Sequence, residues 1–545
     1  MRKLNAIIIA SSILLILILF GSRFGREIRP ILGFDSESRN IGKFTEIVDY
    51  ISTYYVDDVD WDQTMIGAID GLLRKLDPHS VYISAEDAEL NEENLQGMYQ
   101  GIGIHFDIID GYLTVIVAIP GSPSDKLGLL PGDKIVEIDG ESAYGISVND
   151  VPKKLKGPKG TKVEIKVRRN GIPEDLDFTI IRDDIPISSV NSFFMTADST
   201  GYVSVGRFAK ITNDEVENAL QELLAQGMKR LILDIRWNAG GLLDQAVKLS
   251  AKFLSGRQKI VYTEGRLSEF NEEFYTDTFS SETVFEQPLI VLINHGSASA
   301  SEILAGSIQD HDRGLIVGTT SFGKGLVQRE YPLKDGSRLR LTISKYYTPS
   351  GRLIQRPYEG KDIEQYYETT MDSVQADEAA DSLADRPVYY TDNGRPVYGG
   401  GGITPDVIVK TVTNDKAPAL TQKLYQKRLF FEVASAYAAS HEYLEKDFNS
   451  FLTDFEVSEA LLRQLKGLAI DRGIDFGHLT FQSNSGYFKS RLKAEIARSL
   501  WGNEKYYQVL LLYDNQYLTA LQLFRNIEKL LHDTAGRELV GRKGN

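Results

Sequence analysis

Two apolar runs in this sequence each end in a turn of small residues, and each turn leads into a helical pattern. The first run covers Arg230 to Ile235 and precedes Gly240 and Gly241. The second covers Leu289 to Ile293 and precedes the turn Gly296 to Ser301. Short apolar runs bounded by such turns are typical of buried strands, and strands that alternate with helices predict a parallel sheet. We therefore expect an α/β core.

The second turn contains a serine that suits nucleophilic chemistry. Ser299 stands before a helix that we expect to begin at Glu302. A serine at a strand-to-helix turn exposes its hydroxyl, and the N–H groups at the helix start point toward an incoming oxyanion. Lys324 follows 25 residues later, between Gly323 and Gly325, which let the backbone pass close to other groups. A lysine whose charge is disfavoured by burial can take the proton of a serine hydroxyl, so these two residues are a candidate dyad.

The residues around this pair carry a family resemblance. Ser299 lies in GSASASEILAG, and Lys324 lies in VGTTSFGKGLVQ. Both segments resemble motifs of the carboxyl-terminal processing proteases, also called tail-specific proteases. The resemblance implies a serine endopeptidase with a crotonase- and ClpP-like α/β core in a multidomain chain. It also implies that Ser299 is the nucleophile, that Lys324 is the base and that Gln328 orients the lysine.

The same resemblance extends to the stabilisation of the oxyanion. The residues DIRWNAGG, which end at Gly240 and Gly241, are similar to a family turn that supplies one backbone N–H. The second N–H is implied to come from Ala300. The family usually has proline before the glycines, and Ala239 departs from that pattern without removing the N–H. Asp310 also matches a family position, and the resemblance gives it a supporting role.

Histidines offer an alternative to the lysine base. His295 and His311 flank Ser299, so a Ser-His-Asp triad is an alternative hypothesis. His295 precedes the serine by only four residues, on the wrong side of the turn, which disfavours it. A helical pattern runs from Asn40 to Asn94 and is broken at Pro78. His79 comes directly after this proline. It lies in an LDPHS segment that resembles a family motif, and we expect it to be a cap or a surface group.

The segment from Gly97 to Arg182 resembles a PDZ domain. The resemblance rests on a glycine-containing loop and on the stretch LGLLPGDKI, which begins at Leu127. Glycines let consecutive N–H groups converge on a terminal carboxylate, and an adjacent edge strand accepts a peptide as an added strand. The loop residues expected to bind a substrate's unstructured C-terminus are Gly101, Ile102, Gly103 and Ile104.

The N-terminus predicts a membrane segment. Arg2 and Lys3 precede a stretch of apolar and small residues from Leu4 to Phe20, and three arginines follow within the next nine residues. The stretch is short for a spanning helix and long for a signal-peptide core, and no small-x-small cleavage site follows it. We expect a retained signal anchor in the inner membrane, with the catalytic part in the periplasm or extracytoplasmic space.

Composition excludes several classes of function. The chain has 61 Lys and Arg against 76 Asp and Glu, and a net charge of −15 argues against nucleic acid as a partner. It has no cysteine, which excludes disulfides, a thiol nucleophile and zinc–thiolate sites. No cluster of His, Asp and Glu has ligand spacing, so we expect neither a metal nor an organic cofactor.

The 545 residues suffice for several domains. We expect a signal anchor and flank at 1–35, a helical region at 36–96, the PDZ domain at 97–182, the protease core at 183–410 and a helical extension at 411–545. An acidic insertion at 360–385 interrupts the core. Aromatic residues at helical spacing in 420–431 and 506–524 predict either core or a dimer surface, so a homo-oligomer is one interpretation.

These features favour a membrane-anchored serine endopeptidase whose PDZ domain captures the C-terminus of its substrate. A non-catalytic PDZ scaffold on a protease fold is the alternative, against which the intact set of Ser299, Lys324 and Gln328 argues. A third hypothesis is an acyl-transfer relative of the crotonases, which would not need a PDZ domain.

Overall fold

The computed structural model describes residues 35–533 except 170, 280–283, 361–363, 368–385 and 413. The chain divides into two compact units, Met1–Lys75 and Leu76–Asn545. The predicted signal anchor, Leu4 to Phe20, lies outside the described residues. Among the described residues, no helix combines the length and the apolar character that crossing a membrane requires.

Two helices form the described part of the first unit, α2 (Asp35–Tyr54) and α3 (Trp61–Leu73). The side chain of Asp60 caps α3 by accepting the N–H of Gln63. The apolar stripe on α2 is largely exposed, since Phe44 and Ile47 keep 45% and 48% of their surface accessible.

The prediction of helix as far as Asn94 is wrong in one place. Val81–Ile83 forms strand β1, which pairs antiparallel with β18 (Arg338–Tyr347), and α4 (Ala85–Gln96) begins only after it. Asp77 prepares this strand by making a tight turn, in which its carboxylate accepts the N–H groups of His79 and Ser80. Local periodicity could not show the strand because its partner lies more than 250 residues away.

The PDZ domain is an antiparallel sheet in the order β3-β4-β5-β7-β8, so β3 is an edge strand. Its elements are β3 (Ile104–Ile109), β4 (Tyr112–Ala118), α5 (Pro123–Lys126), β5 (Lys134–Ile138), β6 (Glu141–Ser142), α6 (Asp150–Leu155), β7 (Lys162–Arg168) and β8 (Leu176–Ile181). Before and after it, β2 (Met98–Gly101) and β9 (Asp183–Pro186) pair as a ribbon that leads into the core.

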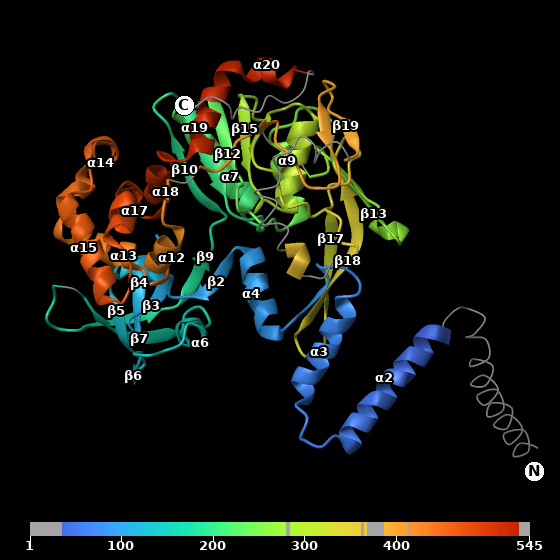
Figure 1. The fold of residues 1–545 in the computed structure, drawn as a ribbon, viewed down its shortest axis with the longest axis horizontal. Coiled ribbons are helices and arrows are strands. Elements are labelled where there is room, and N and C mark those ends of the chain that lie inside the picture. The colour runs from blue at the N-terminus through green and yellow to red at the C-terminus, as the bar shows by residue number, and fades with distance from the viewer. Residues whose placement is uncertain are drawn as a thin grey trace, which may run out of the picture. The chain divides into compact units, whose positions relative to one another are not determined.

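The protease core is built on a second sheet, in the order β10-β11-β12-β15-β16-β21. All neighbours in it are parallel except β10 and β11, which confirms the expected α/β class. The strands are β10 (Val190–Met195), β11 (Thr200–Val205), β12 (Arg230–Asp234), β15 (Leu289–Ile293), β16 (Leu315–Gly318) and β21 (Val407–Ile408). Figure 1 shows this sheet with α9 close beside it.

Both faces of this sheet are covered. Side chains that alternate along the strands, such as Leu233 and Val291, pack with helices α7 (Thr212–Ala225), α8 (Leu243–Ala251) and α9 (Ala300–Asp310). Those between them, such as Ile232 and Leu292, pack with residues of the C-terminal helices. The strands are therefore apolar throughout because a helical layer buries each face.

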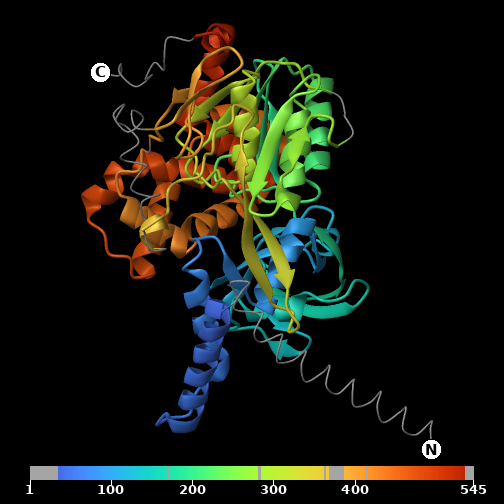
Figure 2. The same ribbon diagram turned by 90° about the vertical axis from the view of Figure 1, so that its right-hand side faces the viewer.

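The core contains another, separate sheet, and Lys324 lies just before its strand β17 (Leu326–Pro332). This sheet contains β1, β18, β13 (Lys259–Gly265) and β14 (Glu273–Tyr275), and β17 pairs with β18. Figure 2 shows β17 and β18 as a long two-stranded ribbon that extends away from the rest of the core. A short hairpin, β19 (Val388–Tyr390) and β20 (Pro396–Tyr398), follows the insertion.

The C-terminal extension is helical, as expected. Its helices are α12 (Pro418–Gln426), α13 (Leu429–Ser440), α14 (Phe448–Asp454), α15 (Glu459–Asp471), α16 (His478–Ser483), α17 (Ser485–Trp501), α18 (Asn503–Leu511), α19 (Asn515–Leu523) and α20 (Ile527–Leu531). Aromatic residues of both stripes point inward: Phe430 lies in the core of this extension, and Tyr517 and Phe524 pack on the protease sheet. Of the two predicted interpretations, the stripes form core.

Candidate active site

Ser299 occupies a strained turn between β15 and α9. Its backbone has φ 56° and ψ −114°, a region that residues with a side chain seldom adopt. Helix α9 begins directly after it at Ala300, two residues earlier than expected. The early start has a cause: the Glu302 carboxylate accepts the Ser299 N–H at 2.8 Å, which caps the first turn. The half-buried serine therefore stands at the helix N-terminus.

Glu302 connects the serine turn to the lysine loop. One carboxylate oxygen accepts the backbone N–H groups of Ser299 at 2.8 Å and Lys324 at 2.9 Å. The other accepts the Ser321 hydroxyl at 2.5 Å and the Gly323 N–H at 2.7 Å. The side chain is completely buried, and this burial raises the pKa of Glu302, while the four donors oppose the rise.

Sequence reasoning did not single out Glu302. The signal that would have found it is the spacing Ser-x-x-Glu at the start of a helix, which is the capping-box pattern. The pattern shows that the carboxylate reaches back to Ser299. It contains nothing about Gly323 or Lys324, which tertiary structure brings to the same carboxylate.

Lys324 is held in an environment that weakens its charge. Burial lowers the pKa of Lys324 to about 8, Arg340 lowers it further, and Glu302 and Asp77 oppose the change. The ammonium donates to Gln328 Oε1 at 2.6 Å. Among the described residues, no hydrogen bond joins Lys324 to the Ser299 hydroxyl. The structure thus brings the two predicted residues to one site through Glu302, with the dyad bond itself not formed.

The LDPHS segment contributes to the site through its backbone. The Gln328 amide donates to the carbonyl of His79, so this turn fixes the glutamine that in turn accepts from Lys324. The imidazole itself is buried against Tyr366, whose hydroxyl lies 3.1 Å from Nε2. Burial lowers the pKa of His79 to about 4, with Lys324 and Arg356 lowering it further and Asp77 opposing them. The expectation of a cap or surface histidine was wrong, because Tyr366 of the acidic insertion packs edge-on against the imidazole.

The glycine turn lies directly against the serine. A Cβ atom on Gly240 would approach Ser299 Cβ to 2.8 Å and Ala300 N to 3.0 Å. The Gly240 N–H donates to Asn238 Oδ1 at 2.9 Å, inside its own turn. The backbone N–H groups of Gly241 and Ala300 are, by contrast, without a hydrogen-bond partner among the described residues.

The other predicted candidates lie away from this cluster. Asp310 ends α9, about 16 Å along the helix from Ser299, and its buried carboxylate pairs with Arg352 at 2.6 Å. His295 packs edge-on against Trp237, and His311 contacts Asp392 and a backbone carbonyl. Neither histidine contacts the serine, so the structure does not assemble a Ser-His-Asp triad from described residues.

Asp234 and Arg236 form an ion pair at 2.6 Å. Arg236 also contacts Asp514 at 2.8 Å, which joins the glycine turn to the C-terminal helices. Among the described residues, no group of three or more His, Asp and Glu side chains is placed to hold a metal ion.

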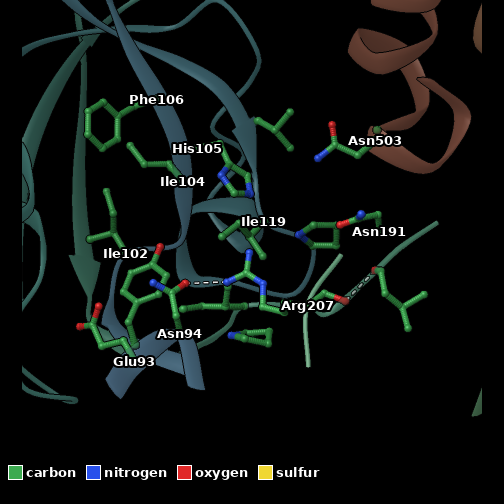
Figure 3. A pocket seen from close by; sticks show the side chains of 18 of the residues that line it. Glu93, Asn94, Ile102, Ile104, His105, Phe106, Ile119, Asn191, Arg207 and Asn503 are labelled. Atoms are coloured by element: carbon green, nitrogen blue, oxygen red, sulfur yellow. Dashed lines mark hydrogen bonds between the residues drawn. The ribbon is translucent and has the colours of Figure 1, made fainter. Parts of the chain in front are cut away.

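The predicted carboxylate loop opens onto a pocket of about 700 Å³. Gly103 has φ +83°, and a Cβ there would lie 2.2 Å from Ser122 Cβ, so the loop requires glycine. Ile102 and Ile104 line the pocket together with α6. Figure 3 shows that Arg207 of the core and Asn503 of the C-terminal helices also face this space.

Family models match four parts of the chain. Peptidase family S41 matches residues 199–365, and a PDZ domain matches 114–169. The N-terminal domain of the activating protease CtpB matches 33–87, and a family of unknown function, DUF8443, matches 420–502.

Known proteins with similar sequences carry related names. The carboxy-terminal-processing protease of Bartonella bacilliformis is 38% identical over 321 residues, which are 58% of this chain and 73% of that protein. The carboxy-terminal processing protease CtpB of Bacillus subtilis is 35% identical over 326 residues, 59% of this chain and 67% of that protein. A solved photosystem II D1 C-terminal processing protease is 30% identical, over 57% of this chain and 83% of its own, with a TM-score of 0.32.

Proposed function

The chain belongs to the carboxy-terminal processing proteases of peptidase family S41, and from this premise we propose that it is a serine endopeptidase with Ser299 as nucleophile and Lys324 as base. The observation that supports this most is the Glu302 carboxylate, which binds the backbone N–H groups of both residues. A lysine pKa of about 8 leaves a fraction of the amine neutral near pH 7, as a base requires.

In the proposed reaction, neutral Lys324 accepts the Ser299 proton as the oxygen attacks the scissile carbonyl. The N–H groups of Ala300 and Gly241 stabilise the oxyanion, with Gly240 as a further donor once it releases Asn238. Protonated Lys324 then gives its proton to the leaving amine. Water activated by the same lysine hydrolyses the acyl-enzyme. Gln328 keeps the amine aimed at the site, because it accepts from Nζ and is itself fixed by the His79 carbonyl.

We further propose that the PDZ domain captures the free C-terminus of a substrate protein. We propose that this capture favours a conformation in which Lys324 hydrogen-bonds the Ser299 hydroxyl. Two features support a conformational step: the Ser299 hydroxyl does not yet reach Lys324, and Gly240 still donates to Asn238. A terminal carboxylate would bind at Gly101 to Ile104, and the chain before it would add to the free edge of β3.

We propose an inner-membrane location for the chain, with Leu4 to Phe20 as anchor and the catalytic part on the extracytoplasmic side. The proposal rests on the basic residues and the apolar stretch of the sequence alone. Cell fractionation with alkaline carbonate extraction tests it: an anchored protein stays with the membrane pellet, and a protein released into the supernatant contradicts the anchor.

Labelling with a fluorophosphonate tests the nucleophile. The unsubstituted protein should become labelled, Ser299→Ala should not, and Ser297→Ala serves as the matched control because Ser297 is buried in the same turn. Labelling that persists in Ser299→Ala would exclude this serine. Peptide binding without labelling or cleavage would favour the alternative, a non-catalytic PDZ scaffold.

A further inference from the structure

The pocket beside the PDZ loop has walls from α4, the PDZ domain, the protease core and the C-terminal extension. The PDZ domain supplies Ile102 and Ile104 on one side and helix α6 on another. The C-terminal extension closes it with Trp501, Asn503 and Tyr507, from the end of α17 and the start of α18. The edge strand β3 therefore faces a partly open pocket instead of bulk solvent alone. A peptide added to β3 would lie between the PDZ domain and the C-terminal helices.

Two partly exposed ion pairs join the PDZ domain to these helices. Arg428 of the C-terminal extension pairs with Asp107 on β3, and Arg472 pairs with Asp110 in the following turn. Figure 1 shows α13 and α15 beside the PDZ strands accordingly. The pocket thus results from how these domains are arranged. One of the two ion pairs involves Asp107 on β3, the strand that would receive a peptide.

The charges in the pocket are balanced except for one arginine. Lys156 pairs with Glu93, and Glu504 pairs with Lys505 outside the lining. Arg207 donates to the neutral amide of Asn94 at 2.5 Å, and no carboxylate among the described residues lies within ion-pair distance of it. Burial lowers the pKa of Arg207 and Glu215 opposes this, yet a guanidinium stays charged at any physiological pH.

Figure 3 shows this arginine hydrogen-bonded to Asn94, in the same pocket that Ile102 and Ile119 of the PDZ domain line. We propose that Arg207 of the protease core binds the terminal carboxylate of a substrate tail that lies along β3, in the pocket that the C-terminal helices close. This proposal rests on the capture of substrate tails by the PDZ domain. The loop N–H groups and the guanidinium would then share the carboxylate, as two donor sets of complementary geometry.

The lining also defines the chemistry of the preferred tail. Ile102, Ile104, Val151 and Leu155 surround the space next to the loop, so the terminal side chain should be apolar. A tail that ends in aspartate or glutamate would place a second negative charge among these residues and bind more weakly. The contact would also connect the protease core to an occupied PDZ groove, because Arg207 follows core strand β11 directly.

Binding measurements on the full chain test the proposal. Two fluorescent peptides of one sequence ending in Leu-Leu, one with a free C-terminus and one amidated, are titrated into the Ser299→Ala protein, which prevents cleavage. We expect the acid to bind about tenfold more tightly than the amide or better. Adding Arg207→Gln should lower this preference about threefold or more without abolishing it, because the charge is lost while the loop N–H groups remain and glutamine keeps a donor for Asn94.

Lys210→Gln is the matched control. Lys210 also follows β11 and donates to an amide of α4, Gln96 Oε1 at 2.8 Å, but it does not line the pocket. It should keep the full preference for the acid. Arg207→Lys should give an intermediate preference, because a point charge remains without the planar pair of donors.

The outcomes separate this proposal from the one it rests on. Equal affinity for acid and amide in the Ser299→Ala protein would contradict PDZ capture itself. A preference that survives Arg207→Gln unchanged would overturn only the role of Arg207. Salt provides a check without any change at 207: raising it from 50 to 500 mM should weaken the acid much more than the amide, and parallel losses would also count against the arginine.

Discussion

At the scale of single residues, Lys324 is the group whose properties the fold changes most. Its amine is ordinary in the sequence and becomes a candidate base only because burial lowers its pKa to about 8. Glu302 opposes that change through its negative charge while positioning the lysine backbone. The two side chains therefore have coupled effects that kinetics can separate.

The first prediction concerns the proton acceptor. Lys324→Ala should lower kcat/KM by about 100-fold to 10,000-fold, because it removes the general base. Lys324→Arg should fail equally, since guanidinium does not lose its proton near neutral pH. In the unsubstituted protein, kcat/KM should rise with pH to an inflection near 8, the pKa of the buried amine. Near-normal turnover by Lys324→Ala would contradict the mechanism.

The second prediction concerns stability at the same position. Because the folded-state pKa is below the unfolded value, the unfolded chain binds more protons between about pH 8 and 10.5, and stability rises across that window. Below pH 8 the buried amine is charged, and this lowers the free energy of unfolding. Lys324→Met should therefore stabilise the protein at pH 7 by about 1–3 kcal/mol and by much less at pH 10. Thermal melts at both values, with exposed Lys345→Met as the control, measure this.

The third prediction concerns Glu302 as a positioning residue. Glu302→Gln keeps the side-chain shape but presents an NH₂ group to backbone donors, so kcat should fall about 100-fold with KM little changed. Removing the negative charge should also move the inflection of the pH profile below 8, because the carboxylate raises the lysine pKa. An unchanged inflection would show that Glu302 acts only on stability.

At the scale of elements, the site depends on two strand-to-helix turns that touch each other. Gly240 has φ +100°, and a Cβ there would lie 2.7 Å from the Ala298 carbonyl oxygen. The turn after β12 must therefore be glycine for the turn after β15 to adopt its strained form. A Cβ on Gly240 would also lie 3.0 Å from the Ala300 backbone nitrogen.

The fourth prediction tests that contact. Gly240→Ala should destabilise the fold by about 1–3 kcal/mol and abolish most activity, because both the backbone angle and the clash resist the methyl group. Gly227→Ala is the control: it has φ +88° but nothing within 4 Å of the added atom. Gly227→Ala should lower stability because of its backbone angle alone. It should leave turnover per folded molecule unchanged. Equal activity losses in both variants would mean that the contact with Ser299 is unimportant.

At the scale of the whole molecule, the C-terminal extension holds the second unit together. It covers one face of the protease sheet, contacts Arg236 beside the glycine turn, and pairs with the PDZ domain through Arg428 and Arg472. These PDZ pairs are partly exposed, so each should contribute less than about 1 kcal/mol and weaken with salt. Together they contribute to holding the C-terminal helices beside the β3 side of the pocket.

The fifth prediction follows from that arrangement. The double variant Arg428→Ala with Arg472→Ala should speed amide hydrogen exchange in β3 and α13, because the interface opens more often. Arg168→Ala removes an ion pair inside the PDZ sheet, with Asp175, and is the control. Exchange that is faster only in the control would show that these two arginines do not hold the interface.

Local patterns sufficed for several features. The strand Leu289–Ile293 has the predicted bounds because a continuous apolar run between turns has few other ways to be buried. The parallel sheet and the helical C-terminus were also predictable, since each depends on periodicity within a short window, and the PDZ segment was predictable from its resemblance to PDZ domains. Strand β1 and the buried state of His79 were not, because both depend on partners far along the chain.

The sequence by itself determined which residues of this protein suit nucleophilic and basic chemistry, because a small-residue turn before a helix and a glycine-flanked lysine are local patterns. Only tertiary structure decided how these residues act. It brought the Ser299 and Lys324 N–H groups to one buried carboxylate, assigned the Gly240 N–H to Asn238, and made Arg207 line the same pocket as the PDZ loop. The physical reason is that burial and hydrogen-bond partners belong to the folded chain, and they change the pKa and the availability of groups whose identity the sequence already contains.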